Sequence, residues 1–252
     1  MATIPQLMSS LIDSVSTALQ LIIGLDAALI ATVERSLAVS ALACLLACAV
    51  GVVLGAWLGV ARFVGRDGVL ALLNTALAVP SVVVGLVVYL LLSRSGPLGS
   101  LGWLFSFKAM VLAQALLVVP VATALTRQVV EDADHRHGEQ IRSLGARPLM
   151  CSLILGWDER YALLTVVLAS FGRAISEVGA VMIVGGNIEG FTRVMTTAIA
   201  LETSKGDLAL ALALGIILLA VVLVLNALVA GVRRWREQVD GSVSNAAHGV
   251  VA

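Results

Sequence analysis

The stretch SLAVSALACLLACAVGVVLGAWLGVA, residues Ser36–Ala61, carries no charged side chain over its whole length. A helix needs about 20 mainly apolar residues to cross the hydrocarbon core of a bilayer. This stretch is long enough to do so, and charged residues, Arg35 and Arg62, stand directly on either side of it. It therefore predicts a membrane-spanning helix and decides the fold class.

The composition of the whole chain agrees with this prediction. Of the 252 residues, 60% are hydrophobic and only 13% are charged, and the mean hydropathy is +1.03. A soluble core cannot absorb that much apolar surface, whereas a bilayer can. The formal net charge is zero, which indicates no nucleic-acid partner. We expect an all-α, polytopic membrane protein.

Four further windows are long and apolar enough to span. They are Val69–Leu92, Ala109–Leu125, Tyr161–Val184 and Leu208–Val232. A sixth candidate, residues 11–33, carries Asp13, Gln20 and Asp26, which favours an amphipathic interfacial helix. The expectation is five transmembrane helices, or six if residues 11–33 also cross.

Three segments follow from these windows: an N-terminal amphipathic segment (1–35), a transmembrane domain (36–232) and a short tail (233–252). Lys and Arg are about twice as frequent on the Arg62 side of the predicted spans as on the other side. Because cytoplasmic loops carry the excess of positive charge, the Arg62 side and the C-terminus are expected in the cytoplasm. The expected location is a bacterial-type cytoplasmic (inner) membrane.

A long charged loop, RQVVEDADHRHGEQIRSLGARPLMCSLILGWDERY (residues 127–161), separates the third and fourth windows. One interpretation is a solvated loop of mixed charge. The other is a helix that ends at Gly145, followed by an apolar helix that exposes Leu149, Met150, Leu153 and Ile154. Such a surface, within residues 131–157, suggests a docking site for a soluble partner.

The fourth window contains two charges, within SFGRAISEVGAVMIVGGNI (Ser170–Ile188). A charge at the bilayer centre costs about 2.5–3.5 kcal/mol on insertion scales, and such residues usually face the bundle interior or water. Arg173 and Glu177 are spaced i, i+4 and can pair on one helix face. They are either a buried pair that fixes packing or part of a gate on a polar pathway.

The segment after this window is rich in glycine, hydroxyl and amide groups. Gly185 and Gly186 allow the backbone to bend, and hydrogen-bond donors follow at Asn187, Thr192, Thr196 and Thr197. Neutral donors of this kind can pass an anion without retaining it. The alternative is an ordinary extracytoplasmic loop.

Several activities lack their motifs. The chain has no G-x-x-x-x-G-K-[ST] phosphate loop, so we expect it to bind no nucleotide. We predict no metal site and no catalytic residues, because His135 and His137 fit a solvated loop and no nucleophile–base arrangement is recognisable. The cysteines are expected to pack as small apolar side chains.

A resemblance to a known family begins in the charged loop. The stretch EQIRSLGA (Glu139–Ala146) resembles the EAA loop of ABC-importer permeases, with Glu139 and Gly145 at the motif positions. The resemblance implies that the segment from Ala146 to Leu155, including Leu149 and Leu153, faces a cytoplasmic ATPase. Gln140 and Ile141 depart from the motif, and Gly156-Trp157 stands where Leu-Pro is usual.

A second resemblance covers FGRAISEVGAVMIVGGNIEGFTRVMTTAIALETSKGD (Phe171–Asp207) and VPSVVVGLVVYLLLSRSGPLG (Val79–Gly99). Both are similar to permeases for molybdate, tungstate and sulfate, and the first is most similar to the tungstate branch. This implies a type I ABC-importer permease for a tetrahedral oxyanion, expected to be tungstate, with molybdate and sulfate as alternatives.

The resemblance also implies partners. They are a second copy of the chain, a cytoplasmic ABC ATPase dimer that would hold ATP and Mg²⁺, an extracytoplasmic oxyanion-binding protein, and membrane lipid. Two other classes remain as alternatives. One is an ion-gradient-driven secondary transporter with Arg173–Glu177 as a proton-linked pair, and the other is an intramembrane enzyme.

Overall fold

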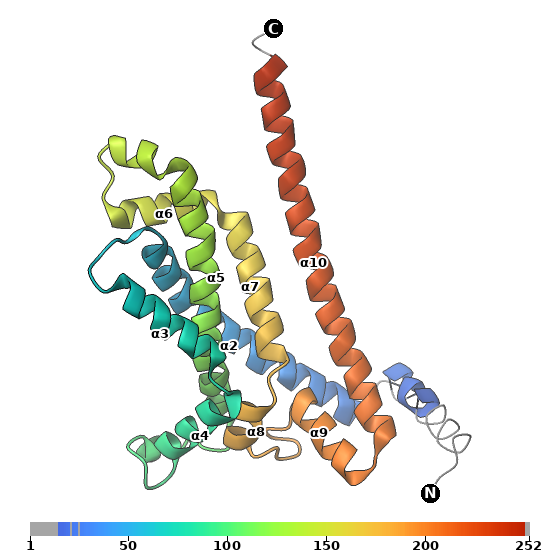
Figure 1. Cartoon of the computed structure of the whole chain (residues 1–252). Coiled ribbons are helices and arrows are strands. Elements are labelled where there is room, and N and C mark those ends of the chain that lie inside the picture. Colours follow the sequence, from blue (N-terminus) through green and yellow to red (C-terminus); the bar gives the residue numbers. More distant parts are fainter. Residues whose placement is uncertain (1–14, 21, 25, 250–252) are drawn as a thin grey trace, which may run out of the picture. The chain divides into compact units, whose positions relative to one another are not determined.

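The computed structural model of the chain describes residues 15–20, 22–24 and 26–249 (Figure 1). Within these ranges the side chains of residues 233 and 235–249 are not described. The elements are α2 (Ala27–Val60), α3 (Arg66–Ala78), α4 (Ser81–Leu92), the short 3₁₀ helix η1 (Gly99–Leu101), α5 (Phe107–Ser143), α6 (Pro148–Asp158), α7 (Arg160–Ile175), α8 (Gly179–Gly185), α9 (Met195–Lys205) and α10 (Leu208–Gly249).

The described part of the chain is helical and contains no strand, as the sequence predicts. Among the described residues, three helices are each long and apolar enough to cross a membrane: α2, α5 and residues Leu208–Val232 of α10. The number rises to five if two bent pairs, α3 with α4 and α7 with α8, each count as one span. The predicted helix at residues 11–33 lies partly outside the described residues.

Several boundaries differ from the predicted windows. Helix α2 begins at Ala27, well before the predicted start at Ser36. Helix α5 runs past Leu125 to Ser143, so the first half of the charged loop continues this helix rather than forming a separate one. In the same way α10 continues through the predicted tail to Gly249.

The predicted span Val69–Leu92 consists of two helices rather than one. Helix α3 ends at Ala78, and α4 begins at Ser81 after Pro80, whose φ of −60° and ψ of 132° are extended. A proline disfavours the α conformation of the residue before it, here Val79, and its ring nitrogen has no hydrogen to donate. The chain therefore breaks at this proline, whereas α5 continues through Pro120.

The predicted span Tyr161–Val184 is likewise interrupted. Helix α7 ends at Ile175 and α8 starts at Gly179. A break at membrane depth exposes backbone groups that need new partners. Here the hydroxyl of Thr196 donates a 2.7 Å hydrogen bond to the carbonyl of Glu177, inside the break.

The chain forms two compact units. Unit 1 comprises Met1–Leu45, Val79–Leu117 and Arg173–Val222, and unit 2 comprises Leu46–Ala78, Val118–Gly172 and Leu223–Ala252. In unit 1, α4 packs against α8 so closely that a Cβ on Gly85 would lie 2.7 Å from the Cα of Ala180. The core around this contact includes the buried side chains of Val88, Met110 and Val181.

Unit 2 is built around a glycine stripe on α2. A Cβ on Gly51 would lie 2.7 Å from the Cβ of Ala122, and one on Gly59 would lie 3.0 Å from the Cβ of Val130. Between them, a Cβ on Gly55 would lie 2.5 Å from a backbone oxygen of α5. Small residues every four positions let two membrane helices approach closely, and here they bring α2 against α5.

Candidate functional site

The turn between α5 and α6 has the predicted helix–glycine–helix geometry. Helix α5 ends at Ser143, and Gly145 adopts a φ of +84°, a left-handed conformation that favours glycine. The backbone N–H of Gly145 donates to the carbonyl of Arg142 at 3.0 Å. Pro148 then occupies the first turn of α6, where its missing N–H costs nothing.

Helix α6 has one buried face. Cys151 and Leu155 are buried and pack with Val60, Val130 and Ala133 in the core of unit 2. This contact holds α6 against α2 and α5. It also accounts for Cys151, which packs as a small apolar side chain, as predicted.

The opposite side of α6 is apolar and exposed, as the sequence predicts. Leu149 is 64% exposed and Leu153 is 68% exposed, and Met150, Ile154 and Trp157 are exposed as well. Several large exposed apolar side chains on one helix indicate contact with another protein or with lipid.

The other predicted coupling residues lie on the same turn. Glu139 is exposed near the end of α5 and borders a cavity of about 410 Å³ with Arg62, Arg142 and Pro148. Gly145 is exposed, whereas Ala146 is half-buried against the core of unit 2. All five predicted residues therefore belong to unit 2.

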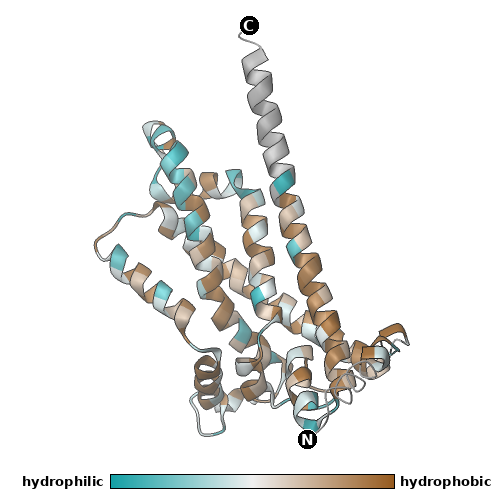
Figure 2. Cartoon of the chain, turned by 45° about the vertical axis from the view of Figure 1, so that its right-hand side comes forward, coloured by the Kyte–Doolittle hydropathy of each residue, from teal (hydrophilic) through white to brown (hydrophobic). Residues whose placement is uncertain are grey.

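The hydrophilic residues of this region gather along the second half of α5 (Figure 2). They are paired rather than simply solvated. Asp134 is buried, with a side chain only 3% exposed, and accepts hydrogen bonds of 2.8 and 3.3 Å from Arg142. These hydrogen bonds raise the pKa of the Arg142 guanidinium, in the last turn of α5 beyond its apolar stretch, above its ordinary value.

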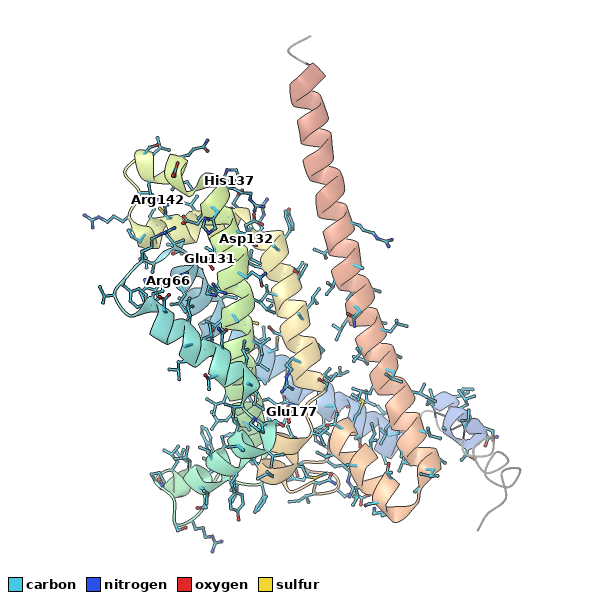
Figure 3. All side chains as sticks on the ribbon, viewed as in Figure 1. Arg66, Glu131, Asp132, His137, Arg142 and Glu177 are labelled. Carbon is cyan, nitrogen blue, oxygen red and sulfur yellow. The ribbon has the colours of Figure 1, made fainter. Side chains whose placement is uncertain are left out.

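Two further carboxylates complete this network. Glu131 accepts hydrogen bonds from Arg66 at 2.7 Å and from Arg127 of its own helix. Figure 3 labels Arg66 and Glu131, which lie next to each other. Glu159, at the junction of α6 and α7, pairs with Arg136 at 2.5 Å. These two pairs connect the second half of α5 to the start of α3 and to the junction of α6 and α7. The interpretation as a merely solvated loop does not describe these residues.

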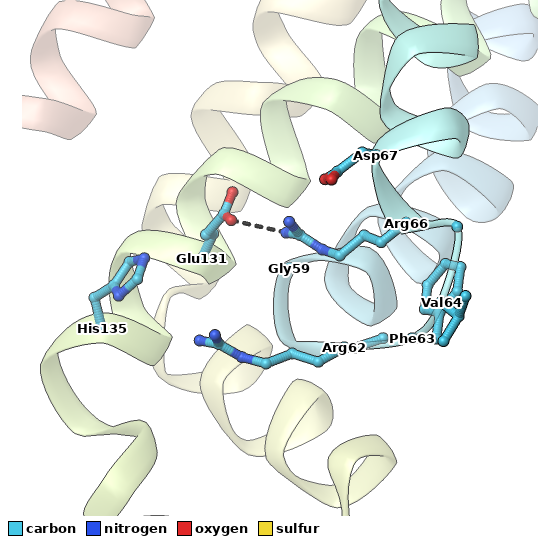
Figure 4. A pocket seen from close by; sticks show the side chains of 10 residues that line it. Gly59, Arg62, Phe63, Val64, Arg66, Asp67, Glu131 and His135 are labelled. Carbon is cyan, nitrogen blue, oxygen red and sulfur yellow. Dashed lines mark hydrogen bonds and ion pairs between the residues drawn. The ribbon is translucent and has the colours of Figure 1, made fainter.

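A cavity of about 470 Å³ lies beside this network (Figure 4). Its polar lining includes Arg62, Arg66, Asp67, Glu131 and His135. Acidic and basic groups balance there, so the cavity has no strong preference for an anion. Among the described residues no group of three or more His, Cys, Asp or Glu side chains could hold a metal ion.

Arg173 and Glu177 form the predicted pair in unit 1. The Nη1 atom of Arg173 lies 2.8 Å from Oε2 of Glu177, although the break between α7 and α8 begins between them. The carboxylate also accepts from the backbone N–H of Ala180 at 3.2 Å and hydrogen-bonds with Ser81. Glu177 thus joins α4, α7, α8 and, through its carbonyl, Thr196 of α9.

The two partners differ sharply in exposure. The side chain of Glu177 is 4% exposed and that of Arg173 is 40% exposed. The Glu177 carboxylate accepts hydrogen bonds from Arg173, from the Ala180 N–H and from Ser81, whereas part of the Arg173 side chain stays exposed. The structural interpretation fits the carboxylate, and only the arginine has a surface available to a solute.

The predicted pathway residues of the following loop are mostly engaged internally. Thr192 is fully buried, donates to the carbonyl of Gly185 at 2.5 Å and accepts from the N–H of Ile188. Buried Thr197 caps the start of α9 by accepting from the N–H of Val194, and Asn187 donates to its carbonyl at 3.2 Å.

The glycines shape the same loop. Gly186 has a φ of +69°, and a Cβ there would lie 2.8 Å from the ring of Phe105. A Cβ on Gly185 would lie 2.7 Å from the sulfur of Met110. The predicted pathway residues therefore come together in unit 1 as a tightly hydrogen-bonded loop.

Sequence reasoning missed several residues of this arrangement. Buried Gln114 donates from Nε2 to the carbonyl of Ala174 at 3.0 Å, at the end of α7. Buried Ser36 accepts a 2.6 Å hydrogen bond from the N–H of Met195. Polar side chains inside otherwise apolar helices were the available signal, since they need partners within the protein.

Comparison with known proteins shows which family the chain belongs to. Residues 51–238 match the family described as binding-protein-dependent transport system inner membrane component. The chain belongs to this family. A tungstate uptake system permease protein of Campylobacter jejuni is 39% identical over 214 residues, 85% of this chain and 90% of that protein.

Two other relatives are similar over most of their length. The tungstate uptake system permease protein of Peptoclostridium acidaminophilum is 39% identical over 222 residues, which cover 88% of this chain and 97% of that protein. A probable anion ABC transporter permease protein of Haloferax volcanii is 43% identical over 189 residues, 73% of this chain and 80% of that protein. The resemblance to oxyanion permeases is confirmed.

Proposed function

We propose that the chain is the transmembrane permease subunit of an ATP-driven importer for tungstate. The observation that carries this proposal is the 39% identity to two tungstate uptake permeases over 85% and 88% of the chain. Molybdate and sulfate are tetrahedral dianions like tungstate, and they define the alternatives within the same transporter class.

The exposed turn between α5 and α6 would be the docking site for a cytoplasmic ATPase. Gly145 and Met150 are exposed there, and Glu139 lies one turn before the helix end. Because Glu131 of α5 pairs with Arg66 of α3, and Arg136 of α5 pairs with Glu159 directly before α7, a displacement of the turn would be transmitted to those helices. This chain would hold no nucleotide itself, and ATP and Mg²⁺ would bind to the ATPase.

Transport by alternating access requires two states with different contacts. The chain would work as a homodimer, with one ATPase on each copy and an extracytoplasmic protein that captures and delivers the oxyanion. Arg173 would meet the anion as it passes. The excess of Lys and Arg on the Arg62 side supports a cytoplasmic location for that side and for the C-terminus.

The test is uptake by proteoliposomes that contain the chain, its ATPase and the capture protein. We expect tungstate accumulation that needs internal ATP and stops when the ATPase carries an inactive catalytic site. Molybdate and sulfate, added separately at equal concentration, should accumulate more slowly. Accumulation driven by a proton or sodium gradient without the ATPase would refute the proposal and favour a secondary transporter.

A further inference from the structure

An apolar trough of about 670 Å³ runs along unit 2 between α2, α6 and α7. Its walls include Val53 of α2, Leu149 and Leu153 of α6, and Leu164 and Val167 of α7. All these positions lie within unit 2. The trough is open, since Val53 is 67% exposed and Leu153 is 68% exposed.

Two of the three walls of the trough belong to candidate membrane-spanning helices. Helix α2 is long and apolar enough to span, and α7 belongs to a bent pair that passes the same test. Leu149 and Leu153 share a trough with residues of these two helices, whereas Met150 and Ile154, which are also exposed on α6, do not line it. The exposed apolar surface of α6 therefore has two parts. Leu149 and Leu153, predicted to face an ATPase, line the trough with the candidate spanning helices instead.

One end of the trough carries a single charged side chain among its lining residues. The guanidinium of Arg160 lies 4.6 Å from the ring centroid of Tyr161 and 5.9 Å from that of Trp157. Its Nη1 atom donates to the carbonyl of Trp157 at 3.1 Å. In the part of the chain that the structure describes, Arg160 forms no ion pair, and the neighbouring Glu159 pairs with Arg136 instead.

Tryptophan and tyrosine are enriched where a bilayer meets water, and an arginine there attracts acidic lipid head groups. We propose that the trough binds an acyl chain of an anionic phospholipid whose phosphate lies against Arg160. The apolar walls bury the chain, and the exposed arginine supplies the charge complement. The site leaves the Met150–Ile154 side of α6 available to a cytoplasmic partner.

Fluorescence quenching of Trp157 by brominated phospholipids tests this site. The full-length chain would carry Trp57→Phe, Trp103→Phe and Trp235→Phe, so that Trp157 reports alone. Brominated phosphatidylglycerol is titrated into phosphatidylcholine vesicles, and brominated phosphatidylcholine is titrated as the reference. We expect a preference of about fivefold for phosphatidylglycerol, the factor for one basic residue near a lipid surface.

Two matched pairs of variants locate the site. Arg160→Gln should remove the preference, whereas Arg147→Gln, an exposed arginine at the other end of α6, should keep it. Gly156 lines the trough and has room for a side chain, so Gly156→Leu should fill it and weaken quenching by both lipids. Gly231→Leu, with equal room on α10, should leave quenching unchanged.

Native mass spectrometry provides a second measurement. It counts bound lipids directly, so it can use the chain with all four of its tryptophans. Equal affinity for the two lipids, or a preference that survives Arg160→Gln, would overturn the proposal. Absence of quenching by either lipid would also overturn it, because a second copy or another protein would then cover the trough.

Discussion

The different exposure of Arg173 and Glu177 predicts that their substitutions have different consequences. Glu177→Ala removes the acceptor of the Ala180 N–H, which lies at the start of α8 without a partner inside the helix. A buried donor without a partner costs about 1–3 kcal/mol. The loss of the Ser81 contact adds to this cost, and we expect a total of about 2–3 kcal/mol.

Removal of one member of a buried pair costs about 3–5 kcal/mol when it leaves the other charge buried without a partner. Arg173→Gln leaves the buried Glu177 carboxylate, but that carboxylate keeps its hydrogen bonds from Ala180 and Ser81, and a glutamine side chain at the i, i+4 spacing can still donate to it. Arg173→Gln should therefore cost about 1 kcal/mol, the difference between a charge-assisted and a neutral hydrogen bond to the carboxylate. Glu177→Gln keeps a carbonyl oxygen that can accept from Ala180, and it should also cost about 1 kcal/mol.

Thermal unfolding in detergent, followed by size-exclusion chromatography, measures these differences. For a chain of this length, 2–3 kcal/mol lowers the unfolding midpoint by about 4–12 °C, so Glu177→Ala should stand apart from the other two variants. Ser176→Ala is the local control, since this exposed hydroxyl contacts only the carbonyl of Arg173.

Tungstate uptake by the same variants separates packing from transport. Arg173→Gln should lower uptake about tenfold or more, the factor for the loss of a hydrogen bond to a charged group, at nearly unchanged stability. The reasoning fails if Arg173→Gln destabilises the chain as much as Glu177→Ala. It also fails if Arg173→Gln transports normally, because the arginine would then not meet the anion.

Two further predictions follow from glycines. Proline cannot adopt the φ of +84° at Gly145, and it has no N–H to donate to the carbonyl of Arg142. Gly145→Pro should therefore abolish capture of the ATPase in a pull-down, whereas Gly145→Asn should retain it because asparagine tolerates this conformation. Equal capture by both variants would contradict the docking site. Gly55→Ala should lower stability by about 1–3 kcal/mol because its methyl group collides with α5. Gly231→Ala is the control and should raise stability slightly, since a Cβ there meets no other atom. Equal unfolding midpoints of the two variants would exclude the close α2–α5 contact.

The sequence alone determined the features that depend on local pattern. Ser36–Ala61 identifies a spanning helix because transfer of apolar side chains into lipid depends mainly on their composition and length. The same holds for Gly145, since the end of a helix is encoded by the few residues around it. The i, i+4 spacing of Arg173 and Glu177 was enough to predict their contact, and the family resemblance followed from short motifs.

Only the tertiary structure decided where helices break and which polar groups remain available. Hydropathy continues through Pro80 and Ser176, but a helix can break at membrane depth only where distant residues satisfy the freed backbone groups, as Thr196 does for Glu177. Similarly, the sequence suggests that the hydroxyl of Thr192 could contact a passing anion. In the fold, however, this hydroxyl already donates its hydrogen bond to the carbonyl of Gly185. Such partners are far apart along the chain, and no local pattern records them.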